Sequence, residues 1–260
     1  MTVSPDPPEP SDRREPPEPP EPGKATEPSE PADIAARYAR RAATERYRMT
    51  NPDVWHAVQE RQRAMLGLFA RLGWADVSMR SVLEVGCGSG GNLLELLRLG
   101  FAPEHLAGVE LLPERLAAAR HVLPAALALH AGDALALPAH AVAPASVDAV
   151  CVSTVFSSLL DDAYQQRLAD AMWGWVKPGG GVLWYDFTVD NPRNPDVRGV
   201  PRSRIEALFP QGRVQARRVT LAPPIARAVV RVHPGLYPLC NALPLLRTHL
   251  LAWVGKPLTR

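Results

Sequence analysis

The chain has 260 residues, a formal net charge of +2 and 46% hydrophobic residues, which suits one α/β domain of ordinary size with appendages. No apolar run approaches the roughly 18 residues of a membrane span, and the N-terminus lacks the basic and apolar regions of a signal peptide. The three cysteines have no metal-ligand spacing, and their odd number argues against a disulfide framework. We therefore expect a cytoplasmic protein.

Residues 1–31 form a segment rich in Pro and Glu with almost no large apolar side chains. Such a segment cannot bury enough surface to offset the entropy of ordering, so we predict a disordered acidic tail that is locally polyproline-like. Docking to a partner is the alternative role for this tail.

Residues 32–78 are predicted to form an N-terminal helical cap. The first helix spans Ile34 to Arg48. The second is capped by Asn51, begins at Pro52 and stops at Gly73, because Asn caps helices and Pro suits their first turn.

A glycine-rich turn follows the first predicted strand, at residues 82–91. Gly86, Gly88 and Gly91 satisfy G-x-G-x-x-G, and Glu110 follows at about the 20-residue offset of the dinucleotide fingerprint. An NAD-dependent oxidoreductase is therefore one interpretation of this turn.

Glu84 argues for a different cofactor. A carboxylate two residues before the turn would repel a pyrophosphate, but it suits a cationic amino-acid group. With Gly86, Gly88 and Gly90 it forms E-x-G-x-G-x-G, and here the chain resembles the class I S-adenosylmethionine-dependent methyltransferases. In that family the glycine turn contacts the methionine part of the cofactor, and the acidic residue helps to position it.

Two further strand ends agree with this resemblance. The second predicted strand ends in Glu110, followed by Leu111, and the third ends in Gly-Asp-Ala at 132–134. The resemblance implies that Glu110 accepts both ribose hydroxyls, that Asp133 accepts from the adenine amino group and that the backbone of Ala134 contacts the ring. Ser153, at the end of the fourth strand, completes the predicted cofactor residues.

The order of the later elements resembles the same fold. A strand, a helix, Lys-Pro-Gly-Gly and another strand follow one another between residues 146 and 187. We predict an α/β, Rossmann-like, seven-stranded, mostly parallel sheet with an antiparallel last strand and helices on both faces. This methyltransferase domain covers 79–260, with the sixth strand at 213–221, the seventh at 247–254 and an insertion at about 222–244. The insertion is predicted as a lid, with a dimer contact or a membrane-surface patch as alternatives.

The chemistry at the strand ends favours an oxygen acceptor. Asp186 closes the fifth strand and is the candidate general base; capping of the turn at 190–192 is its alternative role. The fourth strand ends in Ser153-Thr154-Val155-Phe156 rather than Asn/Asp-Pro-Pro-Tyr/Phe, which argues against methylation of an exocyclic amine.

These observations predict an S-adenosylmethionine-dependent O-methyltransferase acting on a small molecule or glycan. Its later segments resemble a subgroup associated with bacterial surface-polysaccharide biosynthesis, at Trp184 to Phe187, Leu221 to Pro224 and Leu245 to His249. The alternatives are an NAD-dependent oxidoreductase and a non-catalytic cofactor-binding module. No nucleic-acid partner is expected. We assign no metal site, and the acceptor and the oligomeric state stay open.

Overall fold

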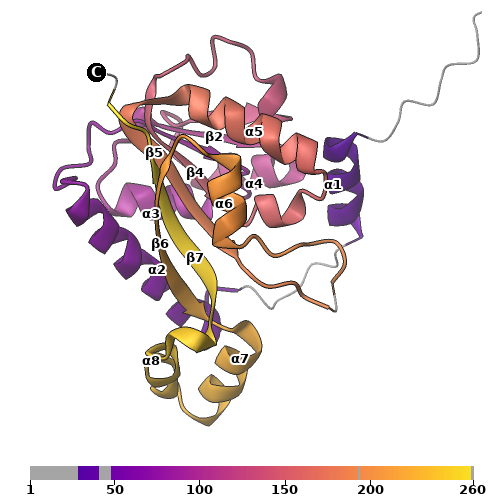
Figure 1. The fold of residues 1–260 in the computed structure, drawn as a ribbon, viewed down its shortest axis with the longest axis vertical. Coiled ribbons are helices and arrows are strands. Elements are labelled where there is room, and N and C mark those ends of the chain that lie inside the picture. The colour runs from indigo at the N-terminus through magenta and orange to yellow at the C-terminus, as the bar shows by residue number, and fades with distance from the viewer. Residues whose placement is uncertain (1–28, 41–47, 193, 259–260) are drawn as a thin grey trace, which may run out of the picture.

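The computed structural model describes residues 29–40, 48–192 and 194–258, and its centre is a seven-stranded sheet of order β3-β2-β1-β4-β5-β7-β6 (Figure 1). The first five strands are parallel, and β7 is antiparallel to both β5 and β6. The predicted fold class is confirmed. The strands are β1 (Val82–Val85), β2 (Leu106–Glu110), β3 (Ala128–Ala131), β4 (Val147–Ser153), β5 (Val176–Phe187), β6 (Arg213–Leu221) and β7 (Arg247–Gly255).

Helices cover both faces of the sheet. One face packs on α2 (Pro52–Arg71), α3 (Gly91–Arg98) and α4 (Pro113–Val122), through side chains such as Leu68 and Leu93. The other packs on α5 (Asp162–Trp175) and α6 (Arg202–Leu208), around the buried ring of Trp184. The remaining elements are α1 (Glu30–Ala39), α7 (Pro223–Val232), α8 (Leu236–Asn241) and the short 3-10 helices η2 (Pro103–His105), η3 (Ala134–Ala136), η4 (Phe156–Ser158) and η5 (Pro244–Leu246).

All four residues of β1 are buried, as expected for a parallel strand covered on both faces. Such strands are normally continuous apolar runs, and three of the four residues here follow that rule. Glu84 is the exception, with 0% of its surface exposed. A carboxyl group in this position is costly to bury, so its surroundings bear directly on function.

The structure corrects the predicted bounds of two elements. Helix α1 spans Glu30–Ala39 rather than Ile34 to Arg48, so the predicted tail runs into a helix at its last two residues; residues 1–28 of the tail and 41–47 of the predicted helix lie outside the described residues. Strand β5 begins at Val176, ahead of the Lys-Pro-Gly-Gly stretch that was expected to precede it, because Val176 pairs with Val147 and the carbonyl of Gly180 accepts from the N–H of Lys256.

A buried ion pair seats α1 against the carboxyl edge of the sheet. Glu30 Oε1 accepts from Arg37 Nη2 at 2.7 Å and from the backbone N–H of Leu160 at 2.7 Å. Arg37 Nη2 also donates to the carbonyl of Ser158 at 2.9 Å. These contacts join α1 to the segment that follows β4, more than a hundred residues later in the sequence.

The predicted insertion is a small helical lobe, residues 222–246, which contains α7, α8 and η5. It has its own core around Leu221, Ala226 and Tyr237, and it forms the lower end of the molecule in Figure 1. Because β6 runs parallel to β5, the lobe leaves the sheet at its carboxyl edge. None of the helices in the described part of the chain combines the length and apolar character needed to cross a membrane.

We predict that Glu30→Ala releases α1 without unfolding the sheet. The change leaves the buried Arg37 guanidinium unpaired, and breaking a buried pair costs about 3–5 kcal/mol. Amide hydrogen exchange should therefore accelerate at residues 30–39, while strands β1 and β4 keep their protection. Asp33→Ala, in the same first turn, is the control. Unchanged exchange in Glu30→Ala would show that the pair does not seat the helix.

Candidate functional site

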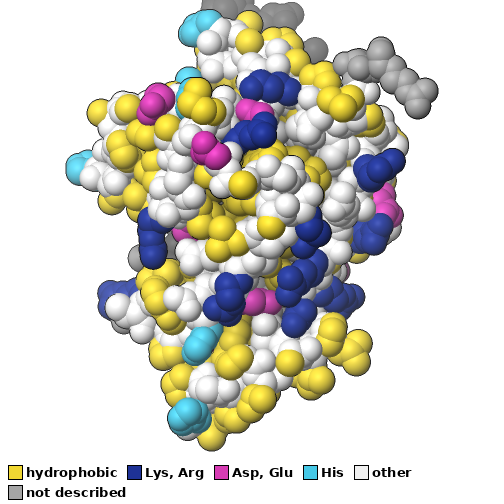
Figure 2. Space-filling view, turned by 90° about the vertical axis from the view of Figure 1, so that its left-hand side faces the viewer, with side chains coloured by type: hydrophobic (Ala, Val, Ile, Leu, Met, Phe, Trp, Pro, Cys, Tyr) yellow, Lys and Arg dark blue, Asp and Glu magenta, His cyan; other side chains and the backbone are white. Residues whose placement is uncertain are grey.

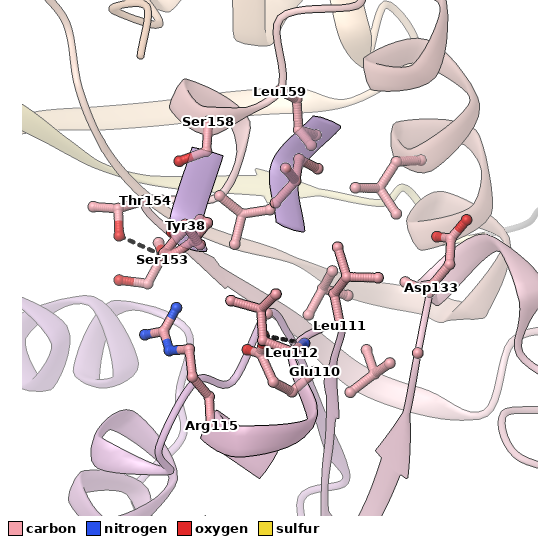
Figure 3. A pocket seen from close by; sticks show the side chains of 18 of the residues that line it. Tyr38, Glu110, Leu111, Leu112, Arg115, Asp133, Ser153, Thr154, Ser158 and Leu159 are labelled. Atoms are coloured by element: carbon pink, nitrogen blue, oxygen red, sulfur yellow. Dashed lines mark hydrogen bonds between the residues drawn. The ribbon is translucent and has the colours of Figure 1, made fainter. Parts of the chain in front are cut away.

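The first cavity, of about 720 Å³ including the space at its open mouth, lies at the carboxyl ends of β1, β2 and β4 (Figure 3). Its lining comes from the strand ends and the segments that follow them, and from α1, α4, η4 and α5. The lining residues are Ile34, Tyr38, Val85, Gly86, Val109, Glu110, Leu111, Leu112, Arg115, Gly132, Asp133, Ala134, Ser153, Thr154, Val155, Ser158, Leu159, Tyr164 and Leu168.

Gly86 and Gly88 take left-handed backbone conformations, with φ of 69° and 57°, which favour glycine. A Cβ at Gly86 would lie 2.5 Å from a methyl carbon of Val155, and one at Gly88 would lie 2.7 Å from the Arg115 guanidinium. Close packing therefore excludes larger residues at Gly86, whereas at Gly88 the Arg115 side chain can move and the backbone conformation is what favours glycine. Gly90 is the N-cap of α3 and completes the turn.

The Glu110 carboxylate ties the glycine turn to the start of α4. Its Oε2 accepts from the N–H of Gly88 at 2.7 Å, and its Oε1 accepts from the N–H of Leu112 at 2.9 Å. Each carboxylate oxygen has capacity for a further donor. Glu110 therefore fixes the shape of the turn and presents an acceptor to the first cavity.

Asp133 stands after β3 and caps η3. Its Oδ1 accepts from the N–H of Leu135 at 2.9 Å and from the Tyr164 hydroxyl. Burial, with Asp133 as hydrogen-bond acceptor, raises the pKa of Tyr164, so this phenol stays a donor. The other oxygen of Asp133 has no bond to any described residue and is available to a ligand.

The second cavity, of about 360 Å³ with its opening, lies on the face covered by α2 and α3. It is lined by Arg61, Met65, Glu84, Asn92, Glu95, Leu96, Cys151, Val152, Ser153, Leu183, Tyr185 and Leu251. Glu84 Oε1 accepts from Asn92 Nδ2 at 2.6 Å, whereas Oε2 is buried without a partner among the described residues. Burial raises the pKa of Glu84 to about 7.

The three strand-end acids therefore line two cavities rather than one. Glu110 and Asp133 line the first cavity and Glu84 lines the second; Ser153 lines both. The reason is the strand register. Glu84 pairs with Gly108 inside the sheet, two residues before β2 ends at Glu110.

Arg61 supplies the positive charge of the second cavity. Its Nη2 donates to Asn92 Oδ1 at 2.8 Å and to Glu95 Oε1 at 2.9 Å, and its guanidinium lies 5.0 Å from the ring centroid of Tyr185. The cavity thus presents a carboxylate with a free oxygen beside a guanidinium. This pairing suits a zwitterionic ligand group.

Asp186, the predicted base, lines neither cavity. Only 1% of its surface is exposed, and it accepts from the N–H of Ser157 at 3.0 Å and of Phe187 at 2.9 Å. Burial raises its pKa to about 7. The turn that it was expected to cap instead uses Asp190, which accepts from the N–H of Gly199 at 2.7 Å. These bonds hold η4 against the end of β5, and the role of Asp186 as general base stays a prediction.

Most of the predicted cofactor residues meet at the cavities: Gly86, Glu110, Leu111, Asp133, Ala134 and Ser153 line the first and Glu84 the second. Gly88 and Gly90 shape the turn without lining either. The sequence interpretation missed Arg61, Asn92, Arg115 and Tyr164. Asn92 and Arg115 lie in the first turns of the helices that follow two predicted strands, which is a usable signal; Arg61 lies on a distant helix and has none.

The family described as "Methyltransferase domain" matches residues 82–180. No curated protein matches the chain.

Three solved structures illustrate the structural likeness. Geranyl diphosphate C-methyltransferase from Streptomyces coelicolor, in complex with Mg²⁺, geranyl diphosphate and S-adenosyl-L-homocysteine, is 15% identical with a TM-score of 0.57, covering 90% of this chain and 99% of its own. The N-methyltransferase NodS from Bradyrhizobium japonicum is 18% identical with a TM-score of 0.56, covering 81% and 99%. An S-adenosylmethionine-dependent methyltransferase from Mesorhizobium loti is 15% identical with a TM-score of 0.55, covering 80% and 99%. At these identities the likeness shows the fold. The family match thus covers residues 82–180, and the shared fold extends over most of the chain.

Proposed function

We propose that the chain binds S-adenosylmethionine and transfers its methyl group to an oxygen atom of a small-molecule or glycan acceptor. One observation carries the cofactor assignment: the buried Glu84 carboxylate keeps one oxygen without a partner, in a cavity that also contains Arg61. A buried acceptor of this kind is costly unless a cationic group binds it.

The two cavities divide the cofactor between them in this proposal. The adenosine part takes the first cavity, where Asp133 accepts from the adenine amino group and Glu110 accepts from the ribose hydroxyls. The amino-acid part takes the second, where Glu84 faces the ammonium group and Arg61 the carboxylate. Ser153 lies at the boundary, beside the sulfonium. An NAD-dependent enzyme has no use for a buried carboxylate with a free oxygen next to the turn.

S-adenosylmethionine supplies an electrophilic methyl group on a good leaving group, so the protein has mainly to align the acceptor. Proximity and orientation contribute up to roughly 10 kcal/mol in such reactions. Tyr38 and Ile34 of α1 line the first cavity.

The proposal of an oxygen acceptor rests on the end of β4. Thr154 takes a left-handed conformation with φ of 54°, and its N–H donates to the carbonyl of Tyr185 at 2.8 Å. No side-chain amide follows β4 to grip a planar amino group. The fold itself does not select the atom, because the neighbouring structures include a C-methyltransferase and an N-methyltransferase. Membership of the surface-polysaccharide subgroup stays a prediction.

We predict that Glu110→Ala weakens binding of S-adenosylhomocysteine by about a hundredfold, because ribose acceptors and the anchor of the turn are lost together. Calorimetric titration measures the affinity. Glu114→Ala, an exposed acid in the first turn of α4, is the control and should bind normally. NADH should give no heat with the unmodified protein. Preference for NADH would reject the cofactor assignment.

A second prediction concerns Glu84→Gln and pH. Burial raises the folded-state pKa of Glu84 from 4.5 to about 7. The protonated side chain therefore makes its full contribution to folding stability below pH 4.5, and this contribution is lost as the pH rises to 7. Above pH 7 the buried charge costs ~3 kcal/mol. Glu84→Gln should therefore unfold at higher urea concentration than the unmodified protein at pH 8.

The same variant should bind S-adenosylhomocysteine at least about tenfold more weakly, since a hydrogen bond to a charged group is lost. Glu104→Gln, at an exposed acid, is the matched control for both measurements. Equal affinity in Glu84→Gln would contradict the assignment of Glu84 to the ammonium group.

Asp186→Asn separates the two roles considered for Asp186. Both carboxylate oxygens of Asp186 accept from backbone N–H groups, so the amide NH₂ of the variant side chain would face one of these donors. We therefore expect a loss of about 1–3 kcal/mol in unfolding free energy. Turnover, measured with an acceptor found by screening cell-envelope sugars against labelled cofactor, should fall less than about tenfold. A hundredfold loss of turnover, together with loss of the acidic limb of the pH profile, would instead support the general base.

A further inference from the structure

In the C-terminal part of the chain, Lys and Arg occur without any Asp or Glu. From residue 207 onward the sequence contains no Asp or Glu, while it contains Arg213, Arg217, Arg218, Arg227, Arg231, Arg247, Lys256 and Arg260. The net charge of +2 hides this asymmetry, because acidic residues gather in the N-terminal segment. The lobe of residues 222–246 lies entirely within the basic part.

The lobe also exposes large aliphatic side chains. Their exposed fractions are 78% for Val232, 67% for Leu239, 57% for Leu243 and 91% for Leu245. All four lie outside the small core of the lobe. The lobe has no lining residue in either cavity, so the structure gives no support to the predicted lid.

Exposed arginines lie on the lobe and on the strand that leads into it. Arg231 is exposed on α7, and Arg217 and Arg218 are exposed in the middle of β6. None of these three forms an ion pair with a carboxylate in the described ranges. Figure 2 shows hydrophobic and His side chains over the lower end of the molecule, with Lys and Arg side chains gathered just above them around an acidic side chain.

The composition of this surface selects its partner. Aliphatic side chains beside unpaired guanidinium groups suit a bilayer with anionic headgroups, where the side chains enter the acyl boundary and the arginines stay at the headgroups. A second copy would bring like charges together. A nucleic acid would leave the exposed aliphatic side chains of the lobe without a role, since nucleic-acid bases stack on aromatic rings.

We propose that the lobe docks the protein on an anionic lipid membrane surface. The lobe leaves the sheet at the carboxyl edge, where the first cavity also lies. Docking therefore holds this cavity close to the bilayer. This inference goes beyond the proposed methyl transfer and does not depend on it.

Vesicle co-sedimentation of the full chain tests the proposal. Vesicles of phosphatidylcholine with phosphatidylglycerol should bind the protein, and vesicles of phosphatidylcholine alone should bind it at least roughly tenfold more weakly. The double change Leu239→Glu with Leu245→Glu should lower binding to the anionic vesicles at least about tenfold. These side chains are exposed, so the variant should fold normally by circular dichroism.

Met79→Glu is the matched control, because Met79 is 73% exposed and stands before β1, at the opposite edge of the sheet. It should bind the anionic vesicles like the unmodified protein. The proposal is overturned if the unmodified protein ignores anionic vesicles, or if the double change leaves binding intact. Tighter binding to an RNA oligonucleotide, lost in Arg217→Gln with Arg218→Gln but kept in the leucine variant, would also overturn it. Binding needs no cofactor, so its failure would leave the methyltransferase proposal untouched.

Discussion

A carboxylate buried inside a parallel sheet imposes the main constraint on this molecule. Glu84 has 0% of its surface exposed, and a single side-chain amide, that of Asn92, donates to it. Its other oxygen lacks a donor in the described part of the chain, which a stable core would normally avoid. The arrangement is understandable if the missing donor arrives with a ligand. Asn92, Arg61 and Glu95 then form the frame around that ligand group.

The rest of the site follows from the topology. Parallel strands bring their carboxyl ends to one edge, where open α/β sheets bind ligands. The order β3-β2-β1-β4 sets the turn after β1 between the ends of β2 and β4. Glu110 fixes this turn by accepting from Gly88, so one acid both builds the loop and faces the cavity. Helix α1 closes the side through Tyr38, held there by the Glu30–Arg37 pair.

Local patterns were enough to predict the sheet and much of the site. Short apolar runs that end in Glu110 or before Asp133 indicate strand ends, and the glycine spacing indicates the turn between β1 and α3. Two kinds of feature escaped prediction. Arg61 and Glu30 act through partners distant in the sequence, at Glu95 and Leu160, and no spacing records such contacts. Asp186 has the right position along its strand, but the pleat of β5 turns it into the core.

The most direct test of the account is a crystal structure of the protein with S-adenosylhomocysteine. We expect one ligand spanning both cavities past Ser153, with its adenine at Asp133, its ribose at Glu110 and its ammonium group on the free oxygen of Glu84. A ligand confined to the first cavity, with the Glu84 oxygen still lacking a donor, would contradict the claim that this buried carboxylate exists for the cofactor.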